Sequence, residues 1–282
     1  MERQYKKNEK LEMIFDLVAK NFESVGPQYF TYFGHQLIER SRLTNGKTVL
    51  DVACGRGASL FKSAEIVGEE GLVTGVDFSR KMISELHETA KQNGIRNINA
   101  LKMDAENLEF NDETFDYVFC GLSLHFFSNP LLSLKEMHRV LKNNGEIGIS
   151  TWGMKIKENK KGVYERAYER VYSSSSSDKK SREAGNLDIS SKEGLMDILE
   201  RIGFSDIKMQ IAKKVFYYES KEEWWNEQSN NAVRGFFERI KADDPEIFED
   251  FKNIAFEEVG KDMIDGRIKF EAIVLYGYGE KN

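Results

Sequence analysis

Cysteine, proline and long apolar runs are scarce in this chain. It has two cysteines and three prolines in 282 residues, and no apolar run approaches the ~18 residues of a membrane-spanning helix. Cys54 and Cys120 lack ligand spacing, which argues against both a disulfide framework and a zinc site. The first residues, MERQYKKNEKLEM, contain no apolar signal region. We therefore expect a cytoplasmic protein with no membrane span and no bound metal.

An excess of basic residues is also missing. Acidic residues number 47 and basic residues 41, so the formal net charge is −6. A surface for nucleic acid or for an anionic membrane would need a basic excess, so we expect neither partner. The hydrophobic content of 40% and the aromatic content of 12% are sufficient for a buried core. A homodimer is compatible with this composition.

Strand and helix patterns alternate through the middle third of the chain. Five apolar runs predict strands, at residues 48–52, 72–76, 98–102, 115–120 and 146–151. Helical spacing between these runs predicts helices, at residues 58–67, 79–93 and 130–141. The turn at 143–145, Asn-Asn-Gly, is predicted to precede the fifth strand. Such strand–helix alternation is typical of a doubly wound α/β fold with a mostly parallel sheet.

The second half of the chain is less regular. Residues 154–184 are polar, include the serine run 173–177, and predict a mobile loop. Ser190 and Glu193 have the spacing of a capping box that opens a helix. Three further elements are predicted, namely a strand at 207–218, a helical stretch at 220–259 and a last strand at 267–278. We therefore predict a sheet of seven strands with helical lid insertions.

The glycine turn after the first strand is the most informative motif. The sequence TVLDVACGRGASL runs from an apolar strand through Asp51 to Gly55 and Gly57 and into a helix start. Glycines let a ligand approach the backbone, and a helix start offers free N–H groups. A dinucleotide fingerprint would place a third glycine where Leu60 stands, and Asp51 would repel a pyrophosphate. The turn therefore disfavours an NAD-dependent oxidoreductase and favours a cationic ligand without phosphates.

Two more acids end the next two strands. Asp77 closes the second strand at a distance that suits contact with ribose hydroxyls, and Asp104 closes the third. Three consecutive strand ends that carry aspartate predict one crevice lined by carboxylates. A ligand with ribose hydroxyls, an adenine amine and a positive charge fits this crevice, and S-adenosylmethionine has all three.

Five segments in order, VLDVACGRG, GVDFS, MDAE, FDYVFC and RVLKNNGEI, resemble the sequential motifs of class I S-adenosylmethionine-dependent methyltransferases. They are most similar to the branch of quinone-biosynthesis and natural-product small-molecule enzymes. The resemblance is strong over 36–152 and weaker over 194–211 and the last strand. Arg56 departs from it, in a slot often filled by a small or polar residue, and so does the turn at 143–145, which replaces the commoner Lys/Arg-Pro-Gly-Gly.

The resemblance implies a set of cofactor-binding residues. The methionine part would be held by the glycine turn, at Asp51, Ala53, Cys54, Gly55 and Gly57. The ribose would bind Asp77 between Phe78 and Met82, and the adenine would meet Asp104 and Ala105. The end of the fourth strand would lie beneath the methionine end, at Cys120, Gly121 and Leu122.

The resemblance also implies the reaction, transfer of a methyl group to an O, N or C atom of a small, aromatic or apolar metabolite. The leaving group is a neutral thioether, so the protein has to align the acceptor and remove any proton. A cofactor-binding scaffold with a regulatory or non-methylating role is the alternative, because fold does not fix function. Aromatic residues are predicted to line the acceptor site, at Tyr29, Tyr32, Phe33, Trp152, Trp224 and Trp225.

Of the four histidines, His125 is the predicted general base, because it follows the fourth strand where the loop faces the crevice. A structural role for His125 is the alternative, and many such enzymes need no dedicated base. His87 and His138 fall within predicted helices, and His35 precedes the core on the side where a lid is expected.

These expectations divide the chain into six segments. They are an N-terminal helical lid segment (1–44), the S-adenosylmethionine-binding α/β core (45–152), a polar insertion or loop (153–190), a continuation of the core (191–218), a helical lid insertion (219–266), and the last core strand with the tail (267–282).

Overall fold

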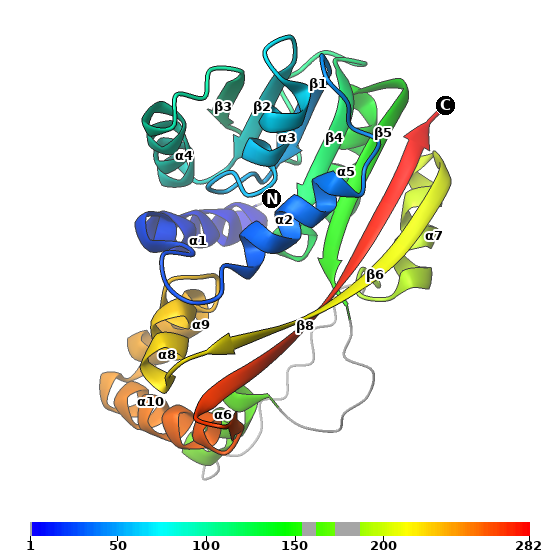
Figure 1. The fold of residues 1–282 in the computed structure, drawn as a ribbon. Helices are drawn as coiled ribbons and strands as arrows, with labels where there is room; N and C mark the ends of the chain where they lie inside the picture. Colours follow the sequence, from blue (N-terminus) through cyan, green and yellow to red (C-terminus); the bar gives the residue numbers. More distant parts are fainter. Residues whose placement is uncertain (1, 154–161, 173–186) are drawn as a thin grey trace.

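The computed structural model describes residues 2–153, 162–172 and 187–282, and a single sheet forms its centre (Figure 1). The sheet order is β3-β2-β1-β4-β5-β8-β6, with the short β7 paired to β8. Strands β1 to β5 pair in parallel, whereas β8 runs antiparallel to both β5 and β6. The prediction of a doubly wound, mostly parallel sheet is confirmed, and β7 adds an eighth strand. The strands are β1 (Thr48–Val52), β2 (Leu72–Asp77), β3 (Ile98–Lys102), β4 (Phe115–Gly121), β5 (Leu141–Trp152), β6 (Phe204–Tyr218), β7 (Met263–Ile264) and β8 (Arg267–Lys281).

Helices cover both faces of the sheet and form a separate insertion. They are α1 (Glu2–Val18), η1 (Ala19–Asn21), α2 (Tyr29–Glu39), α3 (Leu60–Val67), α4 (Arg80–Gln92), η2 (Leu124–Phe126), α5 (Pro130–Val140), α6 (Val163–Tyr172), α7 (Lys192–Ile202), α8 (Lys221–Ser229), α9 (Arg234–Asp243) and α10 (Pro245–Gly260). Within the described residues, no helix combines the length and the apolarity that crossing a bilayer requires.

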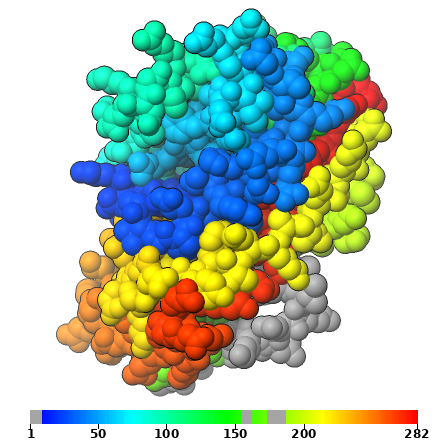
Figure 2. All heavy atoms as spheres, in the orientation of Figure 1, coloured from blue at the N-terminus to red at the C-terminus, as the bar shows by residue number. Residues whose placement is uncertain are grey.

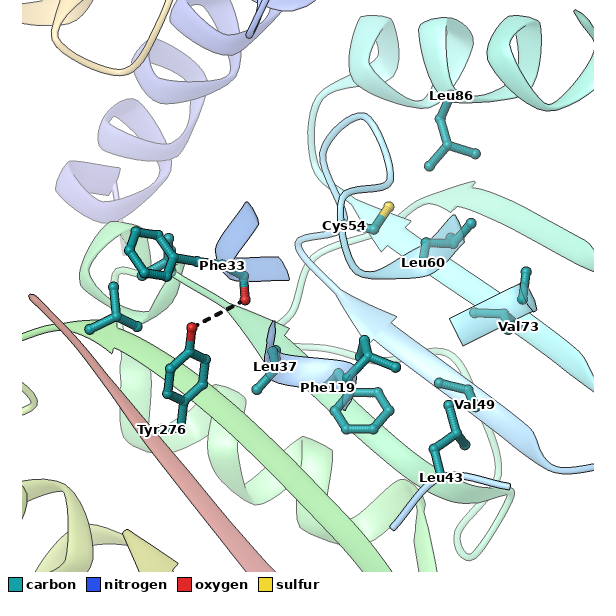
Figure 3. Packing of buried hydrophobic residues seen from close by; sticks show 14 of the residues in the cluster. Phe33, Leu37, Leu43, Val49, Cys54, Leu60, Val73, Leu86, Phe119 and Tyr276 are labelled. Atoms are coloured by element: carbon teal, nitrogen blue, oxygen red, sulfur yellow. Dashed lines mark hydrogen bonds between the residues drawn. The ribbon is translucent and has the colours of Figure 1, made fainter. Parts of the chain in front are cut away.

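Alternate residues of the strands serve two cores on opposite faces of the sheet. Val49 packs into the cluster under α2, α3 and α4, whereas its neighbour Leu50 packs into the cluster under α5 and α7. Figure 3 shows the first cluster, in which Phe33 and Leu37 of α2 lie over the sheet beside Tyr276 of β8. These two cores fix the strand ends at which a ligand site forms.

The antiparallel pair β6 and β8 extends beyond the parallel sheet toward the insertion (Figure 1). There, α6, α8, α9 and α10 enclose a third core that contains Trp224, Phe237 and Phe251. Both strands are longer than predicted, since β6 begins at Phe204 and β8 continues to Lys281. Their pairing with each other extends them, and an apolar pattern alone does not report such pairing.

Local capping signals predicted some boundaries correctly and misplaced others. Ser79 caps α4 as expected, with its Oγ accepting from Met82 N at 3.1 Å. The cap of α7 is Ser191 and not Ser190. Ser191 Oγ accepts from Gly194 N at 3.1 Å, and Asp188 accepts from the hydroxyls of both serines.

Two other expectations were wrong. The turn predicted at 143–145 lies inside β5, where a bulge absorbs the extra residues and Asn144 adopts a positive φ of 61°. The predicted loop contains helix α6, whose Ala167 is fully buried and whose Arg166 binds Glu258 of α10. Residues 154–161 and 173–186, and with them the serine run, lie outside the described residues.

Candidate active site

A crevice with two adjoining cavities lies at the carboxyl ends of β1, β2, β3 and β4. The first cavity has a volume of about 320 Å³ and the second about 370 Å³. Each is within the size range of a small-ligand site. Both are lined by the same five residues where they meet, Ala53, Asp77, Phe78, Phe126 and Phe127.

The glycine turn forms one wall of the first cavity. Gly55 has a φ of 52°, and a Cβ placed on it would meet no atom within 4 Å, so its backbone faces open space. Gly57 has a φ of 94°, and a Cβ there would lie 2.7 Å from the ring of Phe61. The turn therefore exposes backbone at Gly55 to a ligand, whereas Gly57 serves the packing of the helix that follows.

Leu60, which replaces the third glycine of a dinucleotide fingerprint, packs against a glycine of the neighbouring strand. A Cβ on Gly75 of β2 would lie 2.5 Å from Leu60 Cδ1 and 2.8 Å from Cys54 Sγ. The close approach of helix to strand is thus achieved by a glycine on the strand side. Cys54 is a buried filler at this contact.

Asp77 connects the turn to the end of β2. Its Oδ2 accepts from Gly55 N at 2.9 Å, and its Oδ1 accepts from Ser79 N at 2.8 Å. The carboxyl group is buried, and this burial raises its pKa to about 6. Each oxygen keeps acceptor capacity, because a carboxylate oxygen can take more than one donor.

Asp51 lies beneath the turn and lines neither cavity. Its Oδ2 accepts from Ser59 Oγ at 2.7 Å, whereas no hydrogen bond to its Oδ1 occurs within the part of the chain that the structure describes. Burial, together with the neighbouring charge of Asp77, raises the pKa of this carboxyl to about 7. An orphaned oxygen of this kind is costly and is typical of a site rather than of a plain core.

The N-terminal helix α1 covers one side of the crevice. The ring of Phe15 packs edge-on against Phe78 and Phe126, with centroids 5.6 and 5.3 Å apart. Asp16 accepts from Ser79 Oγ at 2.6 Å and so fastens α1 to the start of α4. Figure 2 shows this segment in dark blue between the cyan part of the core and the yellow and orange insertion.

Arg56 ties the glycine turn to the chain that follows α1. Its Nη1 donates to the carbonyl of Phe22 at 2.9 Å and to that of Lys20 at 3.3 Å. The residue that departs from the family pattern therefore holds the covering segment in place. Arg56 also lines the first cavity.

Most of the predicted cofactor residues line the crevice. The first cavity is lined by Cys54, Gly55, Gly57, Met82, Gly121 and Leu122. The second cavity is lined by Asp104 and Ala105. Both cavities are lined by Ala53, Asp77 and Phe78. The structure places Asp51 and Cys120 behind the wall, where both are fully buried. Contact of these residues with a cofactor stays a prediction.

None of the predicted acceptor residues lines either cavity, and their contact with an acceptor stays a prediction. Phe33 and Trp152 pack against each other between α2 and the sheet, with centroids 6.1 Å apart. Tyr29 and Tyr32 belong to the same region, and Trp224 and Trp225 lie in the core of the insertion.

Six phenylalanines outside that predicted set contribute to the aromatic wall of the first cavity. They lie in the segments that precede the core or follow β4, except Phe61, which is in α3 directly after the glycine turn. They are Phe15, Phe22, Phe30, Phe61, Phe126 and Phe127.

The histidine on the cavity wall is His35, whereas the sequence predicted His125 as the general base. His125 lies in η2, where its ring packs against Phe126 at a centroid distance of 4.0 Å, and it lines neither cavity. His35 of α2 lines the first cavity. His87 makes a hydrogen bond of 3.0 Å with the carbonyl of Ala100, and His138 packs edge-on against Phe204.

Comparison with known proteins decides the family. The family model of the methyltransferase domain matches residues 43–203. The chain belongs to this methyltransferase family. The expected resemblance to class I methyltransferases, and to their quinone and natural-product branch, is confirmed by two curated relatives.

The first relative is aklanonic acid methyltransferase DauC of Streptomyces sp. strain C5, 35% identical over 147 residues, which are 52% of this chain and 66% of that protein. The second is demethylmenaquinone methyltransferase of Listeria welshimeri, 31% identical over 145 residues, which are 50% of this chain and 61% of that protein. The chain thus matches less than two thirds of each relative's length.

A solved structure agrees on the fold over most of the chain. It is a crystal structure of a protein from Bacillus halodurans C-125 that is described as a methyltransferase. The two share 21% sequence identity with a TM-score of 0.58, and the match covers 88% of this chain and 98% of that one. This comparison supports the Rossmann-like methyltransferase fold.

Proposed function

We propose that this protein transfers a methyl group from S-adenosylmethionine to an O, N or C atom of a small aromatic or apolar metabolite. One observation carries the proposal. Gly55, Asp77 and Asp104, at three successive strand ends, line a single two-part crevice that aromatic side chains cover. The named acceptors of the two relatives, aklanonic acid and demethylmenaquinone, are small molecules as well.

The residues present fit the proposed cofactor. The open space beside Gly55 admits a ligand, and the free acceptor capacity of Asp77 suits ribose hydroxyls. Asp104 and Ala105 line the second cavity, where the adenine would lie against Phe78. The ionised form of Asp51, whose Oδ1 has no hydrogen-bond partner in the described residues, adds negative potential beneath the turn, which favours a cationic ligand over a pyrophosphate.

S-Adenosylmethionine supplies an electrophilic methyl group on a sulfonium. The protein's own contribution is alignment and exclusion of water. The phenylalanines of the first cavity, among them Phe30 and Phe61, give it an apolar wall. Such a wall favours a reaction in which charge is dispersed between the sulfonium and the acceptor. Arg56 and Asp16 hold the covering segment closed over the reacting atoms.

The remaining expectations join this proposal. A small-molecule acceptor, rather than nucleic acid, agrees with the net charge of −6. A cytoplasmic location agrees with the presence of only two cysteines in the sequence. A homodimer and the six-segment division of the chain also stay proposals. No observation favours the alternative of a non-methylating scaffold.

Calorimetry with S-adenosylhomocysteine tests the cofactor part. The protein should bind it, and Asp77→Ala should weaken binding by about 10-fold or more, because a charge-assisted hydrogen bond contributes roughly 1.5–3 kcal/mol. Asp197→Ala is the matched control, since Asp197 is exposed on α7 and pairs only with Arg201 in the described part of the chain. Absence of binding would overturn the proposal.

Label transfer tests the acceptor part. The protein is incubated with a cell extract and S-adenosylmethionine tritiated in its methyl group. The label should appear in the small-molecule fraction. Label in RNA or protein would reject the small-molecule acceptor, and tight cofactor binding with no transfer would favour the scaffold.

A further inference from the structure

His35 occupies a rigid position on the wall of the first cavity. It follows Gly34, where a Cβ would lie 2.9 Å from Ala58 Cβ and 3.1 Å from Ser59 N. Helix α2 is therefore pressed directly onto the end of the glycine turn. Thr31, one helical turn earlier, lines the same cavity, so the imidazole lies on the cavity face of a fixed helix.

His35 differs from every other polar side chain on this wall in its hydrogen bonding. Each of the others is already engaged with the protein, namely Glu23, Gln28, Thr31, Arg56, Ser59, Asp77, Thr89, Ser123 and Ser150. The imidazole of His35 makes no hydrogen bond or ion pair within the described residues. A base with free ring nitrogens thus faces a cavity whose other polar side chains each already make a hydrogen bond with the protein.

We propose that His35 is the catalytic base that takes the proton from a phenolic hydroxyl of the methyl acceptor. This inference rests on the proposed function. The phenylalanines that line the same cavity suit an acceptor with an aromatic ring. When such an acceptor is methylated on an oxygen attached to its ring, the reacting group is a phenolic hydroxyl. A phenol is largely protonated at neutral pH, so it benefits from a base, and imidazole is the side chain suited to that task near pH 7.

The step balances without any further reactant. The acceptor O–H bond breaks and its proton passes to an imidazole nitrogen of His35. The oxygen uses a lone pair to bond the methyl carbon, while the S–CH₃ bond breaks and leaves its electron pair on sulfur. The sulfonium becomes a neutral thioether, and the proton on His35 returns to solvent.

The test compares His35→Gln with His125→Gln, which removes the base predicted from sequence, and with His87→Gln as the matched control on α4. 1-Naphthol serves as the acceptor probe, because it is an apolar two-ring phenol. Two quantities are measured, the affinity for S-adenosylhomocysteine by calorimetry and the rate of tritium transfer from the labelled cofactor to 1-naphthol. His35→Gln should keep wild-type affinity and lose about 10²–10⁴-fold in rate, as expected for loss of a general base. The other two variants should keep both.

A second measurement does not depend on turnover. In protein labelled with ¹³C at histidine Cε1 and saturated with S-adenosylhomocysteine, added 1-naphthol should shift the His35 resonance and leave that of His87 in place. An unshifted His35 signal, or transfer by His35→Gln at the wild-type rate, overturns the inference. Loss of S-adenosylhomocysteine affinity in His35→Gln also overturns it, since His35 would then bind the cofactor. Wild-type protein that binds no S-adenosylhomocysteine instead contradicts the proposed function itself.

Discussion

The backbone N–H of Gly55 donates to Oδ2 of Asp77 at 2.9 Å, and this bond joins the glycine turn to the end of the neighbouring strand. It places the open side of the turn and a buried carboxyl on one cavity wall. The same carboxyl lines the second cavity, so one residue organises both halves of the crevice.

The two buried carboxyls predict how stability depends on pH. Burial raises the pKa of Asp51 to about 7 and that of Asp77 to about 6, above the roughly 3.9 of an unfolded chain. Their contribution to stability is therefore complete below about pH 4 and is lost as the pH rises through these folded-state values. We expect the free energy of unfolding of the ligand-free protein to fall by a few kcal/mol between about pH 5 and 8, measured by urea denaturation.

Asp51→Asn isolates one of these groups. It removes the ionisation at Asp51 and keeps an acceptor for Ser59, so the pH profile of stability should be flatter than in the wild type. Asp197→Asn, on the exposed face of α7, should keep the wild-type slope. Equal slopes for Asp51→Asn and the wild type would contradict this account.

Arg56→Ala should loosen the N-terminal cover. It removes the donors to the carbonyls of Phe22 and Lys20, so α1 is expected to open more often. Limited proteolysis should cleave the first 22 residues of the variant several-fold faster than those of the wild type. Added S-adenosylhomocysteine should protect this segment from cleavage less in the variant than in the wild type. Arg201→Ala, whose side chain is exposed on α7, is the control. Unchanged cleavage would show that the cover does not depend on Arg56.

Gly75→Ala should destabilise the protein by about 1–3 kcal/mol, as overpacked cores do. The added Cβ would meet Leu60 Cδ1 at 2.5 Å. Leu60→Ala should then lower the free energy of unfolding less in the Gly75→Ala background than in the wild type, because the smaller side chain at position 60 makes room for the added Cβ. Urea denaturation of the four proteins gives the coupling energy. Gly162→Ala is the control, because a Cβ there meets nothing within 4 Å. If the effects of Gly75→Ala and Leu60→Ala on the free energy of unfolding were strictly additive, the contact between the two residues would be contradicted.

Glu227→Ala should destabilise the contact between the insertion and α2. The buried Glu227 carboxylate accepts from Tyr29 Oη at 2.8 Å, Tyr218 Oη at 3.1 Å and Asn231 Nδ2 at 2.8 Å. Its loss leaves buried donors without an acceptor, which costs about 1–3 kcal/mol for each such group. Urea denaturation should show the loss, with Glu222→Ala, exposed on the same helix, as the control. A change below about 0.5 kcal/mol would contradict the assigned role.

The alternation of strands and helices could be predicted because each element carries its own period and its own caps. Ser79 caps α4 with its own hydroxyl, and Pro130 begins α5, so both boundaries depend on neighbours in sequence. The crevice was predictable for a similar reason. The carboxyl ends of parallel strands meet at one edge, which brings Asp77 and Asp104 together.

The aromatic wall could not be predicted, because it depends on how helices dock. Phe30 and Phe33 are separated by less than one helical turn, yet Phe30 lines the first cavity and Phe33 packs fully buried against the sheet. The choice is made by the contact of Gly34 with Ala58, which fixes the rotation of α2. Tyr29 likewise lines neither cavity, and its hydroxyl donates to Glu227 of the insertion.

The most direct test of the central claim is a crystal structure of the protein with S-adenosylhomocysteine. The account predicts both ribose hydroxyls within hydrogen-bond distance of the Asp77 carboxylate, the adenine beside Asp104, and the sulfur at the turn near Gly55. A ligand bound elsewhere, or a ribose that does not contact Asp77, would contradict it.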